Sequence, residues 1–240
     1  MERTASLGSL LYLTDISPYA PVTGSNASSR IAGVHQSLGS SVLAIREMAE
    51  LLGLPFKHFS DVRQILSRDI EQAQVLILYT IGDTPWSRDQ KELILDKVRV
   101  GALGVVGLHS ATDSAHSWPE YQRLVGARFA SHPVTATLPI EVCDRTHSAT
   151  AHLGSQWTLR DELYVFNDLR TDARVLLQAR GGNIEALDDR EGAAVFPLSW
   201  CFQEGEGRCF YTSLGHFVEA FEDSGYLRHL YGGLAWVLGA

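Results

Sequence analysis

The sequence contains few cysteines and no cysteine motif. Its three cysteines are Cys143, Cys201 and Cys209, and none of them belongs to a Cys-x-x-Cys pair. A sparse and odd set argues against a disulfide framework and against a zinc site built from thiolates. We therefore expect reduced thiols, buried in strands and chemically inert, in a cytoplasmic protein.

Long apolar runs and clusters of basic residues are also missing. No segment approaches the roughly 18 consecutive apolar residues that cross a membrane, and the first residues lack the apolar stretch of a secretory signal. The net charge is -8, and no window gathers the Lys and Arg side chains that bind a phosphate backbone. These absences predict a protein that binds neither membranes nor nucleic acids.

Several familiar active-site motifs are absent as well. The chain has no Gly-x-Gly-x-x-Gly, no phosphate-binding loop, no His-Glu-x-x-His and no Gly-x-Ser-x-Gly elbow. A tightly bound nucleotide is therefore not indicated, and any catalytic site has to be found from residues that lie far apart in the sequence.

The chain is organised around residues 100–113. Apolar residues and glycines fill positions 100–108, and the segment then ends in His109, Ser110, Thr112 and Asp113. A short apolar run that stops abruptly at polar groups predicts a buried parallel strand followed by a functional loop. Ligands of open α/β sheets bind outside the carboxyl ends of the strands, so His109 and Ser110 are the first candidate site residues.

The order of the predicted elements indicates one α/β domain over residues 1–240, with residues 1–8 as a flexible tail. Strands and helices alternate in the first half, which predicts a parallel sheet with helices on both faces. The second half adds antiparallel strands. The predicted strands are 10–14, 57–59, 75–79, 100–108, 135–143, 174–178 and a hairpin of 193–202 with 207–213. The predicted helices are 40–52, 88–99 capped by Ser87, 118–126 and 227–238, while 15–29, 129–133 and 144–154 are predicted loops and 157–164 is a short mixed segment.

Histidines recur where predicted strands end. Four of the nine histidines lie at strand ends or in the loops after them, and carboxylates lie nearby: His35, His109, His132 and His216, with Asp113, Glu162 and Glu219. Parallel strands bring such residues to one edge of the sheet. Imidazole and carboxylate groups can hold a divalent metal such as Zn or Mn, or they can act as general acid and base. Purely structural roles remain open for several of them: His132 as a turn residue before Pro133, and Glu162 as a solvated charge.

Several short segments match a known family. They are Gly107-Leu-His-Ser-Ala-Thr-Asp113, His132-Pro133, Asp161-Glu-Leu-Tyr164 and Ser213-Leu-Gly-His216 with Glu219. In this order they resemble the ThuA-like (trehalose utilisation) family. The resemblance implies a class I glutamine amidotransferase-like fold, a flavodoxin-like three-layer sandwich with a mostly parallel central sheet, completed here by the C-terminal β-hairpin and the closing helix. In amidotransferases the elbow after the strand carries a nucleophilic cysteine, which this chain lacks, so glutamine hydrolysis is not expected.

The resemblance implies a role in carbohydrate metabolism, on a sugar or keto-sugar derivative. We expect three catalytic residues, His109, His216 and Asp113, and five substrate-binding residues, His35, Ser110, His132, Glu162 and Glu219. No cofactor is firmly expected; if a divalent metal is bound, the candidate ligands are His109, His132 and His216. The reaction class stays open between hydrolase, lyase and isomerase. A non-catalytic sugar-binding module, an accessory subunit of a sugar oxidoreductase and a homodimer also stay open.

Overall fold

The computed structural model describes residues 8–16, 27–184, 187 and 194–240. Within the first helix, side chains are described from Ser37 onward. The predicted N-terminal tail, apart from Gly8, lies outside the described residues.

Strands of the described residues form one nine-stranded sheet in the order β2-β1-β3-β4-β9-β8-β7-β5-β6. Their bounds are β1 (Ser9–Leu13), β2 (Phe56–Phe59), β3 (Ala73–Leu78), β4 (Gly104–Leu108), β5 (Arg128–Val142), β6 (Gln156–Asn167), β7 (Arg174–Arg180), β8 (Val195–Glu204) and β9 (Gly207–Thr212). The run β2-β1-β3-β4-β9 is parallel, whereas β9-β8-β7-β5-β6 is antiparallel. The parallel half has the strand order of flavodoxin-like folds, which confirms the predicted fold class.

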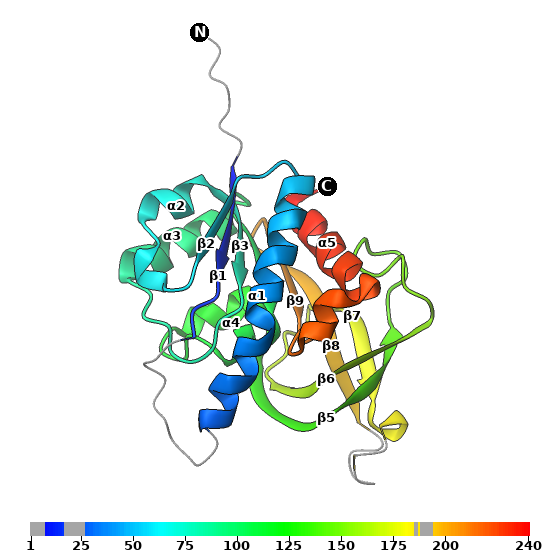
Figure 1. The fold of residues 1–240 in the computed structure, drawn as a ribbon. Helices are drawn as coiled ribbons and strands as arrows, with labels where there is room; N and C mark the ends of the chain where they lie inside the picture. The colour runs from blue at the N-terminus through cyan, green and yellow to red at the C-terminus, as the bar shows by residue number, and fades with distance from the viewer. Residues whose placement is uncertain (1–7, 17–26, 185–186, 188–193) are drawn as a thin grey trace.

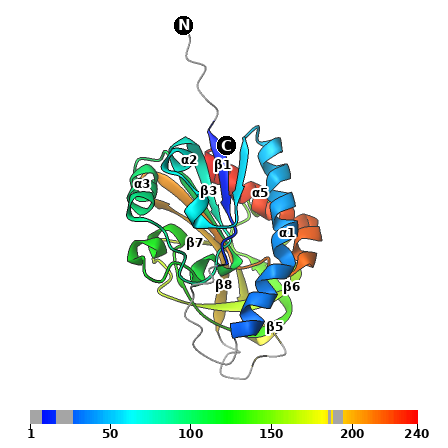
Figure 2. The same cartoon turned by 60° about the vertical axis from the view of Figure 1, so that its left-hand side comes forward.

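Helices cover both faces of the sheet, which makes three layers (Figure 1). The helices are α1 (Ala27–Leu51), α2 (Ser67–Gln72), α3 (Arg88–Arg99), α4 (Gln122–Val125) and α5 (Ser224–Leu238). One apolar core joins α1 and α5 to the sheet, and a second core on the opposite face joins α2, α3 and α4 to it. Figure 2 shows the first strands between α2 and α3 on one side and α1 and α5 on the other. Within the described part of the chain, no helix combines the length and apolar character needed to cross a membrane.

Several predicted boundaries are confirmed because local signals decide them. Helix α3 spans the predicted residues, and the Ser87 side chain accepts a hydrogen bond from the backbone N–H of Gln90 at 3.2 Å. The hairpin of β8 and β9 forms around the predicted glycine-containing turn. Helix α5 ends at Gly239, whose positive φ of 85° suits a glycine cap.

Other boundaries are wrong where tertiary pairing decides. The predicted loop 129–133 lies inside β5, and the segment 157–164 lies inside β6, because these strands pair along most of their length. Pro133 is tolerated because the register shifts between Ser131 and Val134, where a missing backbone N–H breaks no regular ladder. The helix expected from Ser40 begins at Ala27, so the predicted loop 15–29 is shorter than expected; its residues 17–26 lie outside the described residues.

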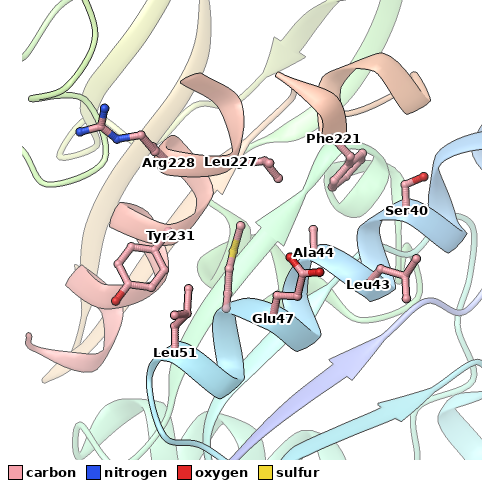
Figure 3. A pocket seen from close by; sticks show the side chains of 10 residues that line it. Ser40, Leu43, Ala44, Glu47, Leu51, Phe221, Leu227, Arg228 and Tyr231 are labelled. Carbon is pink, nitrogen blue, oxygen red and sulfur yellow. The ribbon is translucent and has the colours of Figure 1, made fainter. Parts of the chain in front are cut away.

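A surface groove of about 510 Å³ lies between α1 and α5. Figure 3 shows Leu43, Glu47 and Leu51 of α1 facing Leu227 and Tyr231 of α5 across it. Leu43 and Leu51 are 59% and 75% exposed, so this face is apolar and open. None of the candidate catalytic residues lines the groove.

Candidate functional site

The site forms where two neighbouring parallel strands end. Strand β4 pairs with β9, and Leu108 lies opposite Thr212 at their carboxyl ends. His109 follows β4 directly, and the segment Ser213–His216 follows β9 directly. The imidazoles of His109 and His216 therefore meet, with His109 Nε2 3.1 Å from His216 Nδ1. The structure therefore brings these two histidines together, as the sequence predicts.

His109 occupies a sharp elbow between β4 and a short 3-10 helix, η2 (His109–Asp113). Its φ of 45° lies in the left-handed region, which few residues other than glycine adopt. Two hydrogen bonds hold it there: the Tyr211 hydroxyl donates to the His109 carbonyl at 2.6 Å, and His109 Nδ1 lies 2.7 Å from the Ser213 carbonyl. A strained backbone that the surrounding structure holds in place is typical of functional sites.

The antiparallel half of the sheet supplies a carboxylate from β6. Glu162 Oε2 is 3.3 Å from His216 Nδ1 and 3.6 Å from His109 Nε2, and Glu162 Oε1 is 3.8 Å from His132 Nδ1. Burial acts to raise the pKa of Glu162, but the hydrogen bond from His216 and the neighbouring imidazoles outweigh it and hold this pKa below its usual value. Glu162 is therefore the negative centre of the site.

Asp161, the residue before Glu162, holds the loop that carries His216. Its side chain is completely buried and accepts hydrogen bonds from the backbone N–H groups of Gly215 at 2.7 Å, His216 at 3.3 Å and Glu162 at 2.9 Å. Burial raises the pKa of Asp161 to about 7, against the opposing effect of these hydrogen bonds. Successive strand residues point to opposite faces, so Asp161 fixes the His216 backbone while Glu162 faces the imidazoles.

Tyr164 completes the wall around His109. Its hydroxyl lies 3.0 Å from His109 Nε2, and the two ring centroids are 4.7 Å apart. Burial raises the pKa of Tyr164 well above its usual value, so the phenol keeps its proton and donates it. Glu162 and Tyr164 are two residues apart on one strand, and this alternation is the signal that identifies Tyr164; composition alone suggests only a core residue.

The hydrogen-bond pattern assigns the protons of the two imidazoles. Burial lowers the pKa of His109 to about 4, and the neighbouring His216 contributes to this lowering, so the ring is neutral at pH 7. Its Nδ1–H donates to the Ser213 carbonyl, which leaves Nε2 with a lone pair. His216 Nδ1 faces that lone pair and the Glu162 carboxylate, so Nδ1 of His216 carries the proton.

The remaining candidate residues lie farther from this centre or behind it. His132 lies at its rim in β5, where its side chain is 37% exposed. Asp113 pairs with His116 at 3.4 Å, and Ser110 is fully buried. Glu219 is exposed on a 3-10 helix, η5 (Val218–Glu222), and the side chain of His35 lies outside the described residues.

Three groups at the centre could hold a metal ion. They are His109, Glu162 and His216, each of which offers one donor atom, and all three atoms lie within 4.8 Å of one another. His132, which the sequence suggested as a ligand, does not belong to this set, and Glu162 takes its place.

The ThuA family, described as trehalose utilisation, matches residues 27–237 of the sequence. The chain belongs to the ThuA family. No curated protein matched it.

Solved ThuA-like structures share this fold at low sequence identity. A ThuA-like protein from Parabacteroides merdae aligns with a TM-score of 0.73 and 19% identity, over 97% of this chain and 90% of that one. One from Bacteroides uniformis gives 0.69 and 18%, over 99% and 93%. A cytoplasmic protein from Salmonella typhimurium gives 0.61 and 12%, over 96% and 99%. Membership of the ThuA family supports a carbohydrate-related role at the level of the family.

The cysteines of this ThuA chain lie outside the elbow, where His109 stands. Cys201 and Cys209 are buried, as expected, and burial raises the pKa of Cys201 to about 11. Cys143 is exposed rather than buried, which corrects the expectation from its position in the predicted strand 135–143: β5 ends one residue earlier, at Val142. Partial burial of its sulfur raises its pKa too, so the thiolate is not favoured.

Proposed function

We propose that this chain catalyses proton transfer on a sugar or keto-sugar derivative, with His216 as the base, and that it has no glutamine amidotransferase activity. The observation that carries the proposal is the His216–Glu162 pair, with His216 just after the end of β9 and Glu162 in the middle of β6. A carboxylate that holds the Nδ1–H of an imidazole fixes its tautomer and stabilises the imidazolium that forms when the ring takes up a proton.

The fixed tautomer leaves Nε2 as the basic nitrogen of His216. Among the described residues, this nitrogen has no hydrogen-bond partner, and the side chain is 12% exposed. His109 is only 1% exposed and lies behind His216. A substrate would therefore meet His216, Glu162 and the rim residue His132, while His109 and Tyr164 support the pair from inside.

A keto-sugar suits a base of this kind. The carbonyl group makes the neighbouring C–H bond acidic, so a neutral imidazole nitrogen can take that proton while the bonding electrons move onto the carbonyl oxygen as an enediolate. Return of the proton to a different carbon gives isomerisation, and loss of a substituent from the adjacent carbon gives elimination. This chemistry favours the isomerase and lyase alternatives over the hydrolase.

The proposal is tested with a panel of sugars and 3-keto sugars. Ligands are first selected by their effect on the melting temperature, since a molecule that binds the folded state stabilises it. Selected keto-sugars are then incubated with the protein in D₂O, and loss of the α-proton signal is followed by NMR. We expect exchange in the wild type and a loss of about 100-fold or more in His216→Gln. Glu206→Gln, in the β8–β9 turn, is the matched control and should exchange at the wild-type rate.

Two results would contradict the proposal. Exchange at the wild-type rate in His216→Gln would remove this residue from the chemistry. Tight binding with neither exchange nor conversion would assign the chain to the non-catalytic sugar-binding alternative.

A further inference from the structure

We propose that His109, Glu162 and His216 form a binding site for one first-row divalent metal ion, with zinc as the expected ion. The inference rests on the proposed function only for the location of the site. It adds a metal ion that would bind the oxygen atoms of the substrate.

The distances between the three donor atoms match those of a metal site. His109 Nε2, His216 Nδ1 and Glu162 Oε2 form a triangle with edges of 3.1, 3.3 and 3.6 Å. Zinc binds nitrogen and oxygen at about 2.0–2.2 Å, and tetrahedral angles then place neighbouring donor atoms about 3.3–3.5 Å apart. The triangle therefore already has the size of one face of a zinc coordination tetrahedron.

The protonation of the donors also suits a metal. The Nδ1–H of His109 donates to the Ser213 carbonyl, so Nε2 carries the lone pair; it accepts from the Tyr164 hydroxyl here, and a metal ion would take the place of that hydrogen bond. A backbone carbonyl on the far nitrogen is the usual partner of a metal-binding histidine. His216 needs only to move its proton from Nδ1 to Nε2, which leaves the ring neutral.

The surroundings fix the ligands. Asp161 holds the backbone of His216 by accepting hydrogen bonds from the N–H groups of Gly215 and His216. Glu162 supplies the negative charge next to the ion. Two imidazoles and one carboxylate leave at least one coordination position open, which distinguishes catalytic zinc sites from structural ones.

An ion at this point would act on substrate oxygen. A divalent metal polarises a carbonyl group and stabilises the negative charge that develops on its oxygen. That is the charge which proton removal beside a keto group creates. With Nδ1 of His216 bound to the ion, its Nε2–H would donate a hydrogen bond to the substrate, so the role of His216 as a base belongs to the metal-free protein.

The test measures metal binding without any substrate. The full chain is dialysed against a chelator, and Zn²⁺ and Mn²⁺ are titrated separately by calorimetry at pH 7.5. We expect one zinc ion per chain, with affinity reduced at least about tenfold in Glu162→Gln and in His109→Asn. Asparagine is chosen at position 109 because it tolerates a positive φ better than most residues. Glu162→Gln keeps the test valid if the elbow variant does not fold, and Glu206→Gln should bind zinc like the wild type.

The proposal is overturned if neither ion binds saturably, or if both ligand variants bind zinc as tightly as the wild type. Repeating the D₂O exchange with the chelator present separates the two proposals. Exchange that depends on His216 and persists with the chelator present, together with no saturable metal binding, would leave the proposed function standing and remove the metal site. Stoichiometric zinc binding that depends on Glu162, without exchange on any keto-sugar, would do the reverse.

Discussion

His229 should make the protein lose stability in acid. This residue of α5 is fully buried, with Nδ1 2.8 Å from the Ala149 carbonyl and Nε2 3.1 Å from the Ser199 hydroxyl. Burial lowers the pKa of His229 to about 3, whereas an exposed histidine has a pKa near 6.5. The unfolded chain therefore takes up a proton on this ring before the folded protein does. The stability that the neutral His229 ring contributes is fully present above about pH 6.5, and it is lost progressively as the pH falls toward 3.

The size of the effect follows from the pKa difference. One pKa unit corresponds to about 1.4 kcal/mol, so the full difference corresponds to roughly 5 kcal/mol. Between pH 7.5 and pH 4.5 the unfolded chain takes up this proton while the folded protein does not. The expected loss in the free energy of unfolding over this interval is about 2.5 kcal/mol. This is a large share of the 5–15 kcal/mol by which domains are typically stable.

Replacing His229 by glutamine removes the titrating ring and keeps an amide of similar reach. Urea unfolding of both proteins at pH 7.5 and 4.5 gives the free energy of unfolding at each pH. We expect the wild type to lose about 2.5 kcal/mol more than His229→Gln over this interval. A difference near zero would refute the assignment of a neutral buried imidazole, whatever the absolute stability of the variant.

His116→Gln is the matched comparison. Its hydrogen bond to Asp113 raises the pKa of His116, although the ring is half exposed. The stabilisation from this pair is therefore present in acid and is lost as the pH rises through the raised pKa. His116→Gln should change the pH dependence in the direction opposite to His229→Gln.

Three further substitutions test packing and one hydrogen bond. In α5, Gly232→Ala would place a Cβ atom 2.2 Å from the backbone oxygen of Ser148. We expect the free energy of unfolding in urea to fall by about 1–3 kcal/mol, and an unchanged midpoint would contradict the close approach. In α1, Gly39→Ala meets no atom within 4 Å and should instead raise stability by about 0.5–1 kcal/mol, while a loss would mean that this position is not free. Tyr164→Phe removes the hydroxyl 3.0 Å from His109 and should cost about 1 kcal/mol at pH 7.5; equal stability would show that this hydrogen bond adds nothing.

The parts of the fold that local signals decide could be predicted from the sequence. Ser87 marks the start of α3, and the apolar run before His109 marks β4. The meeting of His109 and His216 was predictable too, because both follow parallel strands and such strands end at one edge of a sheet.

The antiparallel half could not be predicted in the same way. Strands β5 and β6 are long and partly exposed, and polar residues interrupt their pattern, so the sequence predicts a loop at 129–133 and only a short mixed segment at 157–164. Their pairing decides where Glu162 and Tyr164 point. It also separates Asp161, which supports the backbone, from Glu162, which faces the imidazoles. Sequence spacing alone gives no such distinction between adjacent carboxylates.

The position of β9 has a consequence for the synthesis of the protein. This strand comes late in the chain, yet it inserts between β4 and β8 and joins the parallel half of the sheet to the antiparallel half. A nascent chain can pair β1 to β4 on the ribosome, but His109 meets its partner only after residues 207–216 have emerged. Until that point the edge of β4 has no partner on the side that β9 will occupy, and an unpaired strand edge is a site for aggregation.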